Sequence, residues 1–235
     1  MNINWNPYKY RDIWDEVENA EEYRGSFDDY LTAIVDFLDN EQTKYKQNID
    51  DVRKKMVDVS DERLFDELID ELRGAEFQLE SFFPEFENTL FSSFFVAIYF
   101  YLESELTRHC RDLEKQNPKM LLLSDIVGTG VQRSMTYLIK VQCFEFSLEQ
   151  SPEWKKILKY GVLRNCIAHN QGRVDDGFSD GKRKELLEFI QRKDSKLMLD
   201  STKRCILNKS FCSDALQTIE KFLYSVGNAE RPKPQ

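Results

Sequence analysis

The chain alternates between stretches in which apolar residues recur every three or four positions and short breaks that are polar or contain glycine or proline. This spacing places apolar side chains on one side of a helix and is typical of amphipathic helices. It predicts a short helix before a break at Gly25-Ser26 and a helix that begins at Ser60-Asp61. It also predicts helices over 27–55, 84–115, 131–143, 152–171, 182–192 and 210–226. The segment 84–115 is apolar nearly all round in its middle, so we expect it to be buried between neighbours.

Two short apolar runs near the C-terminus, 197–199 and 204–207, are joined through Asp200-Ser201-Thr202 and predict a small β-hairpin. The fold class expected is therefore mainly all-α, a helical bundle with one small β-hairpin. We expect two parts, an acidic N-terminal helical extension over 1–80 and the helical domain over 81–235, followed by a loose tail at 231–235.

The segment 163–172 stands out because it holds one of only two histidines within an otherwise apolar helical pattern. Ser151 and Pro152 are suited to begin this helix as N-cap and first helical residue, and Gly172 is suited to end it. Candidate chemistry therefore lies in the last turns of a helix.

Asn165 and His169 are four positions apart and lie on one helix face. Arg164 and His169 are five apart, about 140° around the axis, so one straight helix does not direct both at one ligand unaided. The long arginine stem, a loosened helix end near Gly172, or a second copy of the helix would each solve this. The last solution requires a dimer.

His169 is the strongest candidate for proton transfer because imidazole titrates nearest to neutral pH, although a histidine there also suits the negative helix end. Arg164 offers a planar donor fork for phosphate oxygens, or a surface ion pair. Asn165 either orients His169, binds substrate, or satisfies backbone groups. No metal-ligand spacing surrounds His109 and Cys110, so we expect no metal site and no cofactor.

Arg164-Asn165-(Cys-Ile-Ala)-His169 resembles the R-N-x-x-x-H signature of the HEPN superfamily. The upstream segment 101–106, with Glu103 and Glu105, resembles the acidic helix of that family. The likeness extends over about 84–226 and includes the expected linking helices, hairpin and closing helix. The resemblance therefore implies a HEPN-like helical bundle.

The resemblance further implies a metal-independent endoribonuclease that cleaves single-stranded or loop RNA to 2′,3′-cyclic phosphate and 5′-hydroxyl ends. Its catalytic residues would be Arg164, Asn165 and His169, supported by Glu103, Glu105 and Asn170. One imidazole per chain implies a homodimer with a composite active site. Such proteins act as toxins or phage-defence effectors, with an antitoxin or defence-system protein as a further partner.

The formal net charge of −9 argues against nucleic-acid binding, but residues 151–210 carry 14 Lys and Arg against 8 Asp and Glu. The segment 151–210 is therefore locally basic. Candidates for following an RNA backbone are Lys155, Lys156, Lys159 and Arg173, and Tyr160 is the candidate platform for a base. A run of charges is equally typical of a solvated helix face.

Net acidity favours an alternative, a non-catalytic HEPN-like dimerisation or binding module such as an adaptor or antitoxin-side protein. A purely structural helical scaffold is a third, weaker reading. Five cysteines without a C-x-x-C pair, and no signal peptide, indicate reduced thiols and a cytoplasmic protein. The longest apolar run, 90–102, is shorter than the roughly 20 residues of a membrane span, so no membrane association is expected.

Overall fold

The computed structural model describes residues 11–116, 118–144, 147–174 and 179–229, with the backbone alone for 11–25 and 193. The expected C-terminal tail at 231–235 and the first ten residues of the predicted extension lie outside these ranges. Within them, no helix combines the length and the apolar character needed to cross a membrane.

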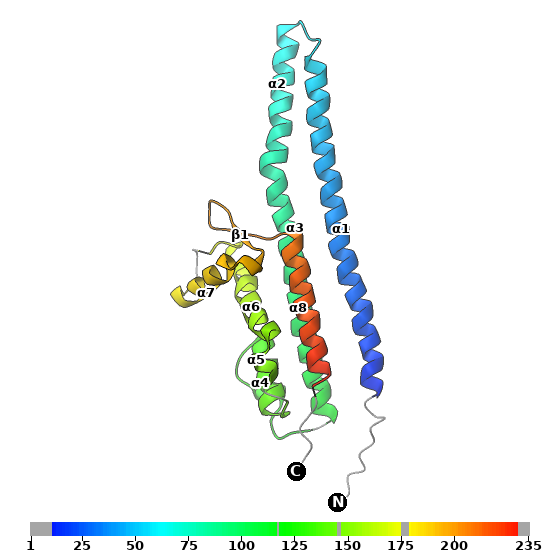
Figure 1. Ribbon diagram of the computed structural model, residues 1–235, viewed down its shortest axis with the longest axis vertical. Helices are drawn as coiled ribbons and strands as arrows, with labels where there is room; N and C mark the ends of the chain where they lie inside the picture. Colours follow the sequence, from blue (N-terminus) through cyan, green and yellow to red (C-terminus); the bar gives the residue numbers. More distant parts are fainter. Residues whose placement is uncertain (1–10, 117, 145–146, 175–178, 230–235) are drawn as a thin grey trace, which may run out of the picture.

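The fold is mainly helical, as predicted. A long antiparallel pair dominates it, formed by α1 (Arg11–Met56) and the run of α2 (Glu62–Phe77) into α3 (Phe83–Gln116) (Figure 1). The shorter elements gather around the half of this pair that lies away from the α1–α2 turn (Figure 1). They are α4 (Gly130–Lys140), α5 (Ser147–Gln150), α6 (Pro152–Asn170), α7 (Asp180–Gln191), β1 (Met198–Leu199), β2 (Cys205–Ile206) and α8 (Lys209–Gly227).

Helix α1 runs without interruption through Gly25 and Ser26, so the break predicted there is wrong. A glycine in a helix interior is unfavourable by only about 1 kcal/mol relative to alanine. Further along α1, the buried residues Leu31, Ile34 and Leu38 pack into the molecule's main hydrophobic core. Tertiary packing of that kind outweighs one weak helix former.

The start of α2 agrees with the sequence, because the carboxylate of Asp61 accepts hydrogen bonds from the backbone N–H of Arg63 (2.9 Å) and Leu64 (3.2 Å). The end of α2 does not show the helix start expected near Ser81. The chain passes through a π-helical turn, Gln78–Phe82, directly into α3.

Pro84 gives a physical reason for this wider turn. It has no N–H to donate to the carbonyl of residue 80, so the regular helical ladder is interrupted there. The N–H of Phe83 instead bonds the Gln78 carbonyl, five residues back. The division expected between residues 80 and 81 falls inside this continuous helix and is marked by no linker.

The core confirms that α3 is buried, with Phe94, Phe95, Ile98, Leu102 and Leu106 all fully enclosed. Helices α4, α6 and α8 contact α3 around this apolar middle. The same core includes residues from the buried side of α1. The N-terminal helix is therefore part of the main packing unit.

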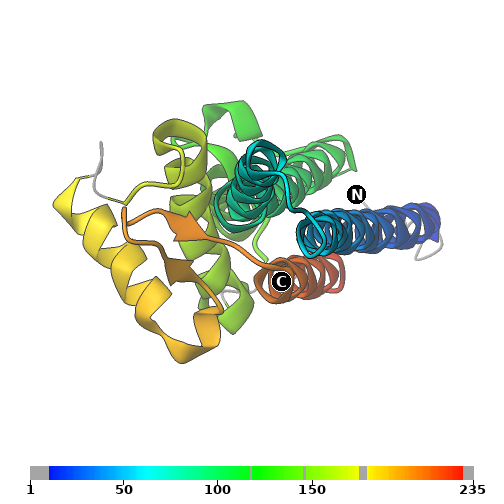
Figure 2. The same ribbon diagram turned by 90° about the horizontal axis from the view of Figure 1, so that it is seen from above.

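The predicted hairpin is present, with β1 and β2 antiparallel and Met198 opposite Ile206 (Figure 2). Asn88 of α3 attaches it to the core. Its side-chain amide donates to the carbonyl of Cys205 (3.2 Å) and accepts from the N–H of Leu207 (2.9 Å). The hairpin is thereby fixed to α3, and the N–H of Cys205 also donates to the carbonyl of Gly172, just after α6 (2.9 Å).

Candidate functional site

Helix α6 carries the motif and begins as the sequence predicts. The hydroxyl of Ser151 accepts from the N–H of Trp154 (3.1 Å), and Pro152 is the first helical residue. At the other end, Gln171 already adopts a left-handed conformation (φ 54°), one residue before Gly172 (φ 81°). The helix thus ends one position earlier than a cap at Gly172 would place it.

Arg164 is held by contacts from α3 and from its own helix. Its Nη2 donates to Oε2 of Glu103 (2.8 Å), and its Nη1 donates to Oδ1 of Asn165 (2.9 Å). The guanidinium carbon lies 4.7 Å from the Phe100 ring centroid and 5.5 Å from that of Tyr99, within cation–π range. The side chains of Arg164 and Glu103 are 19% and 22% exposed, so their ion pair is largely shielded from water.

Glu103 also touches the first residue of α4, Gly130 (φ 54°). A Cβ built on Gly130 would overlap Oε1 of Glu103, so only glycine allows this approach. A carboxylate at this end of α4 faces the positive end of the helix dipole. Glu105 turns elsewhere and accepts a hydrogen bond from Arg108 (2.7 Å) along α3. Of the two carboxylates expected to support the site, Glu103 is the one that contacts Arg164.

Asn165 and His169 are exposed on the outside of α6. Because Arg164 donates to Oδ1 of Asn165, the amide nitrogen Nδ2 is directed away from Arg164, and it has no hydrogen-bond partner among the residues that the structure describes. The His169 side chain has no hydrogen-bond or ion-pair partner among the described residues, whereas Asn170 is half-buried. One helix face therefore presents an amide donor and an imidazole one turn apart.

Tyr99 lies beneath Arg164 and against α6. Burial, together with the nearby Glu103 carboxylate, raises the pKa of Tyr99 above its ordinary value, partly opposed by Arg164. A Cβ built on Gly161 would lie 2.6 Å from the Tyr99 hydroxyl oxygen, so a residue without a side chain is needed at this crossing of α3 and α6.

A groove of about 450 Å³ opens beside Phe100, between α3, the end of α6 and the hairpin. Its walls include Val96, Phe100, Ile167, Gln171 and Arg204. The Phe100 side chain is 52% exposed. Sequence patterns treat Phe100 as one more apolar residue of a buried helix, although it stands three positions before Glu103 and so shares its side of α3.

The basic residues expected to follow an RNA backbone divide into two groups. Lys155 and Arg173 are exposed. Lys156 instead donates to Asp214 (3.0 Å) and Lys159 to Glu185 (2.6 Å), so both charges are paired within the chain. The basic face is weaker than the residue count indicates.

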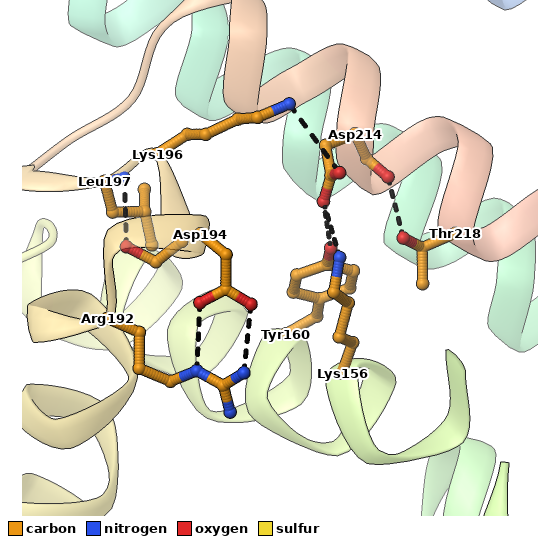
Figure 3. Close-up of polar contacts among 9 residues, drawn as sticks. Lys156, Tyr160, Arg192, Asp194, Lys196, Leu197, Asp214 and Thr218 are labelled. Carbon is orange, nitrogen blue, oxygen red and sulfur yellow. Dashed lines mark hydrogen bonds and ion pairs between the residues drawn. The ribbon is translucent and has the colours of Figure 1, made fainter. Parts of the chain in front are cut away.

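Tyr160 is not a base platform in this structure, because its side chain is only 1% exposed. Its ring packs edge-on against Phe95, Phe189 and Phe211. Its hydroxyl donates to Asp214 (3.3 Å), as Figure 3 shows. The correction follows from burial, since a stacking ring needs an open face.

Asp214 centres a polar cluster that links α6, α8 and the connection before β1. Besides Lys156 and Tyr160 it pairs with Lys196 at 3.7 Å, while Arg192 and Asp194 form a two-bond ion pair nearby (Figure 3). The charged and polar groups of this cluster are paired with one another, which indicates that the cluster holds α6, α8 and the segment before β1 together. In the described part of the chain, no three His, Cys, Asp or Glu side chains are grouped to hold a metal ion.

The comparisons with known proteins find no match, whether against family models, curated proteins or solved structures. The fold and the site define a mainly helical protein that presents an exposed asparagine–histidine pair beside a shielded glutamate–arginine pair.

Proposed function

We propose that this protein is a metal-independent endoribonuclease that cleaves single-stranded or loop RNA to 2′,3′-cyclic phosphate and 5′-hydroxyl ends, as its resemblance to the HEPN superfamily implies. The observation that carries the proposal is the exposed pair of Asn165 and His169, one helical turn apart. Asn165 is oriented by Arg164, which is itself fixed by Glu103. An imidazole that can transfer protons and an amide that can donate a hydrogen bond to a phosphate oxygen thus face solvent together.

The reaction needs one base and one acid. The 2′-hydroxyl oxygen bonds to the adjacent phosphorus as one His169 accepts its proton, and the bond from phosphorus to the 5′-oxygen breaks as a second His169 protonates that oxygen. The Nδ2 of Asn165 donates to a non-bridging phosphate oxygen, whose charge grows during the attack. Arg164 acts here as a positioning residue, because its two terminal guanidinium nitrogens already donate to Glu103 and Asn165.

The second imidazole comes from a second copy of the chain, which makes the homodimer part of this proposal. A protein that sediments as a monomer at micromolar concentration while fully active would contradict the two-histidine site. The protein would act in the cytoplasm as a toxin or defence effector, with an antitoxin or defence-system protein as partner.

Phe100 takes the role of base platform in the proposal, in place of Tyr160. Its exposed ring borders the groove and lies 4.7 Å from the guanidinium carbon of Arg164. Stacking of a base on an aromatic ring contributes about 1–3 kcal/mol, so Phe100→Ala should raise the KM for RNA about 5- to 100-fold. Tyr224→Ala is the matched control, since Tyr224 is 68% exposed on α8 and lines no part of the groove.

Cleavage of a mixed single-stranded RNA and of total tRNA in the presence of EDTA tests the activity. Wild type should leave cyclic phosphate ends, and His169→Ala should abolish cleavage. Asn165→Ala should lower kcat about 100-fold, comparable with loss of one oxyanion donor. His109→Gln, which alters the only other histidine, should keep the activity. Equal inactivity of wild type and all variants would refute the enzyme.

A non-catalytic dimerisation or binding module is the second candidate, and one observation favours it. Both terminal guanidinium nitrogens of Arg164, Nη1 and Nη2, donate to partners within the chain, as in a structural arginine. Expression separates the two candidates: toxicity relieved by His169→Ala supports the nuclease, whereas no toxicity together with tight partner binding supports the module.

A further inference from the structure

Two cysteines, Cys166 and Cys205, lie buried directly beneath the motif. Cys166 is in α6, between Asn165 and His169, and Cys205 is the first residue of β2. Their exposed fractions are 0% and 1%. Neither has a part in the proposed RNA cleavage.

Both cysteines contact the short segment Gly172-Arg173 that follows α6. The Cys166 thiol donates to the Arg173 carbonyl (3.4 Å), and the Cys166 carbonyl accepts from the N–H of Gly172 (3.0 Å). From the other side, the N–H of Cys205 donates to the Gly172 carbonyl (2.9 Å). Gly172 is thus hydrogen-bonded to the backbones of both cysteines. Residues far apart in the sequence therefore form an adjacent pair.

The other three cysteines have different surroundings. The buried thiols of Cys110 and Cys212 donate to backbone carbonyls, those of Ser134 (3.6 Å) and Phe91 (3.5 Å). Cys143 is exposed. The chain thus contains one close thiol pair and three cysteines that serve as internal comparisons.

The interaction between the two neighbouring thiols makes them unequal. It lowers the pKa of the Cys166 thiol, although burial opposes this, and the same interaction together with burial raises the pKa of the Cys205 thiol. An attacking thiol is more reactive when more of it is thiolate. Cys166 is therefore the sulfur that reacts first, and Cys205 is the one that resolves.

We propose that Cys166 and Cys205 form a reversible intramolecular disulfide that ties the motif helix α6 to β2. With hydrogen peroxide as oxidant, the Cys166 thiol loses its proton and the thiolate attacks one peroxide oxygen. The O–O bond breaks, a sulfenic acid forms on Cys166, and the departing hydroxide takes up the released proton and leaves as water. The Cys205 sulfur then attacks the Cys166 sulfur, the S–O bond breaks, and a second water leaves as the S–S bond forms. The two thiols supply the two electrons that reduce the peroxide.

Burial determines the rate of this reaction. A peroxide reaches these sulfurs only when the end of α6 and the hairpin open locally, so the pair reacts more slowly than exposed Cys143. Once formed, the bond restrains the chain between α6 and β2, which includes α7. The oxidised protein should melt at a higher Tm, and a dithiol reductant should reverse the increase.

The experiment uses full-length protein with Cys143→Ser, which removes the exposed thiol, treated with hydrogen peroxide while circular dichroism shows it folded. The intact mass should fall by about 2 Da relative to the reduced protein. Trypsin should release peptides 165–173 and 205–209 joined by a disulfide, and dithiothreitol should separate them. Cys212→Ala in the same background should leave the linked pair unchanged.

The proposal is overturned if no 165–173/205–209 pair forms even after treatment continued far beyond the time that fully oxidises Cys143 in the wild type, or if a different pair of cysteines is joined. Peptide mapping reads the bond directly on a protein with both cysteines intact, so a folding defect in a Cys166 or Cys205 variant does not affect the outcome. The result is also independent of RNA cleavage, so this inference and the nuclease can fail separately.

Discussion

At the scale of single residues, Glu103 decides how Arg164 is used. A guanidinium that is mostly shielded from water needs an ionised partner, and Glu103 provides it while touching the start of α4. The consequence extends to Asn165, whose amide direction follows from the Arg164 hydrogen bond. Two side chains of α6, Arg164 and Asn165, therefore depend on one carboxylate of α3.

Glu103→Gln tests this dependence. Loss of a charged hydrogen bond in a partly buried pair should lower the free energy of unfolding by about 1.5–3 kcal/mol. Glu105→Gln should change it by less than about 1 kcal/mol, because its Arg108 partner is 45% exposed. Urea denaturation of both variants measures the difference, and equal effects would contradict the assignment of Glu103 as the partner that matters.

Asp200 gives the hairpin a defined pH dependence. Its carboxylate accepts from the N–H of Thr202 (2.7 Å) and Arg204 (2.9 Å). Partial burial raises the pKa of Asp200, but these hydrogen bonds outweigh burial and hold it below its ordinary value. A carboxyl group with a lowered folded pKa stabilises the fold above its unfolded pKa, and this stabilisation is lost as pH falls through the folded value.

The urea midpoint of wild type should therefore exceed that of Asp200→Asn by a constant amount from about pH 7 to about pH 5, because the unfolded pKa is about 3.9. Below about pH 4 the two midpoints should converge as the carboxylate is protonated. A difference as large at about pH 3 as at about pH 7 would show that Asp200 acts by other means.

Single residues also show what the sequence could and could not predict. Helical spacing placed Asn165 and His169 on one face, because that relation is local to α6. It named Tyr160 as the open aromatic ring and passed over Phe100. Both stand in apolar helices, and only the packing of α3, α6 and α8 decides which ring is covered. The sequence did not determine the ion-pair partner of Arg164 for the same reason.

At the scale of elements, the crossing of α3 and α6 depends on a glycine. Gly161→Ala would place a Cβ 2.6 Å from the Tyr99 hydroxyl oxygen, so Tyr99 or α6 must shift. Overpacking of this kind should lower the free energy of unfolding by about 1–3 kcal/mol. Because Tyr99 lies under Arg164, the shift should reach the motif.

Gly74→Ala is the matched control for that change. Gly74 also lies inside a helix, α2, but nothing is within 4 Å of a Cβ built on it. Alanine there should raise the free energy of unfolding by about 0.5–1 kcal/mol through helix propensity alone. Thermal melts of both variants provide the test, and changes of the same sign would contradict the packing argument.

Helix starts were predictable where a side chain makes the cap itself, as Asp61 and Ser151 do. Where a helix continues past an apparent break was not predictable. Whether a helix passes Gly25, or passes Ser81 and Pro84, depends on packing between α1, α2 and α3, which no local pattern contains. The sequence therefore predicted most helices, but it placed breaks at Gly25-Ser26 and near Ser81 where the helices continue.

At the scale of the whole molecule, α1 belongs to the core. Leu38→Ala should lower the free energy of unfolding by about 2–4 kcal/mol, because Leu38 is 4% exposed within the main core cluster. Val57→Ala, near the α1–α2 turn, should have almost no effect because Val57 is 78% exposed. Equal small effects in chemical denaturation would show that α1 is a separable extension.

The continuous helix from Glu62 to Gln116 connects distant parts of the molecule. At 1.5 Å per residue it measures about 80 Å, and it joins the α1–α2 turn to Glu103 through a single π-helical turn. If that turn tightened to a regular α-helix, everything beyond it would rotate by about 100° relative to α2. The π-helical turn therefore sets the rotation of α3 about its axis relative to α2, and with it the direction from which Glu103 contacts Arg164.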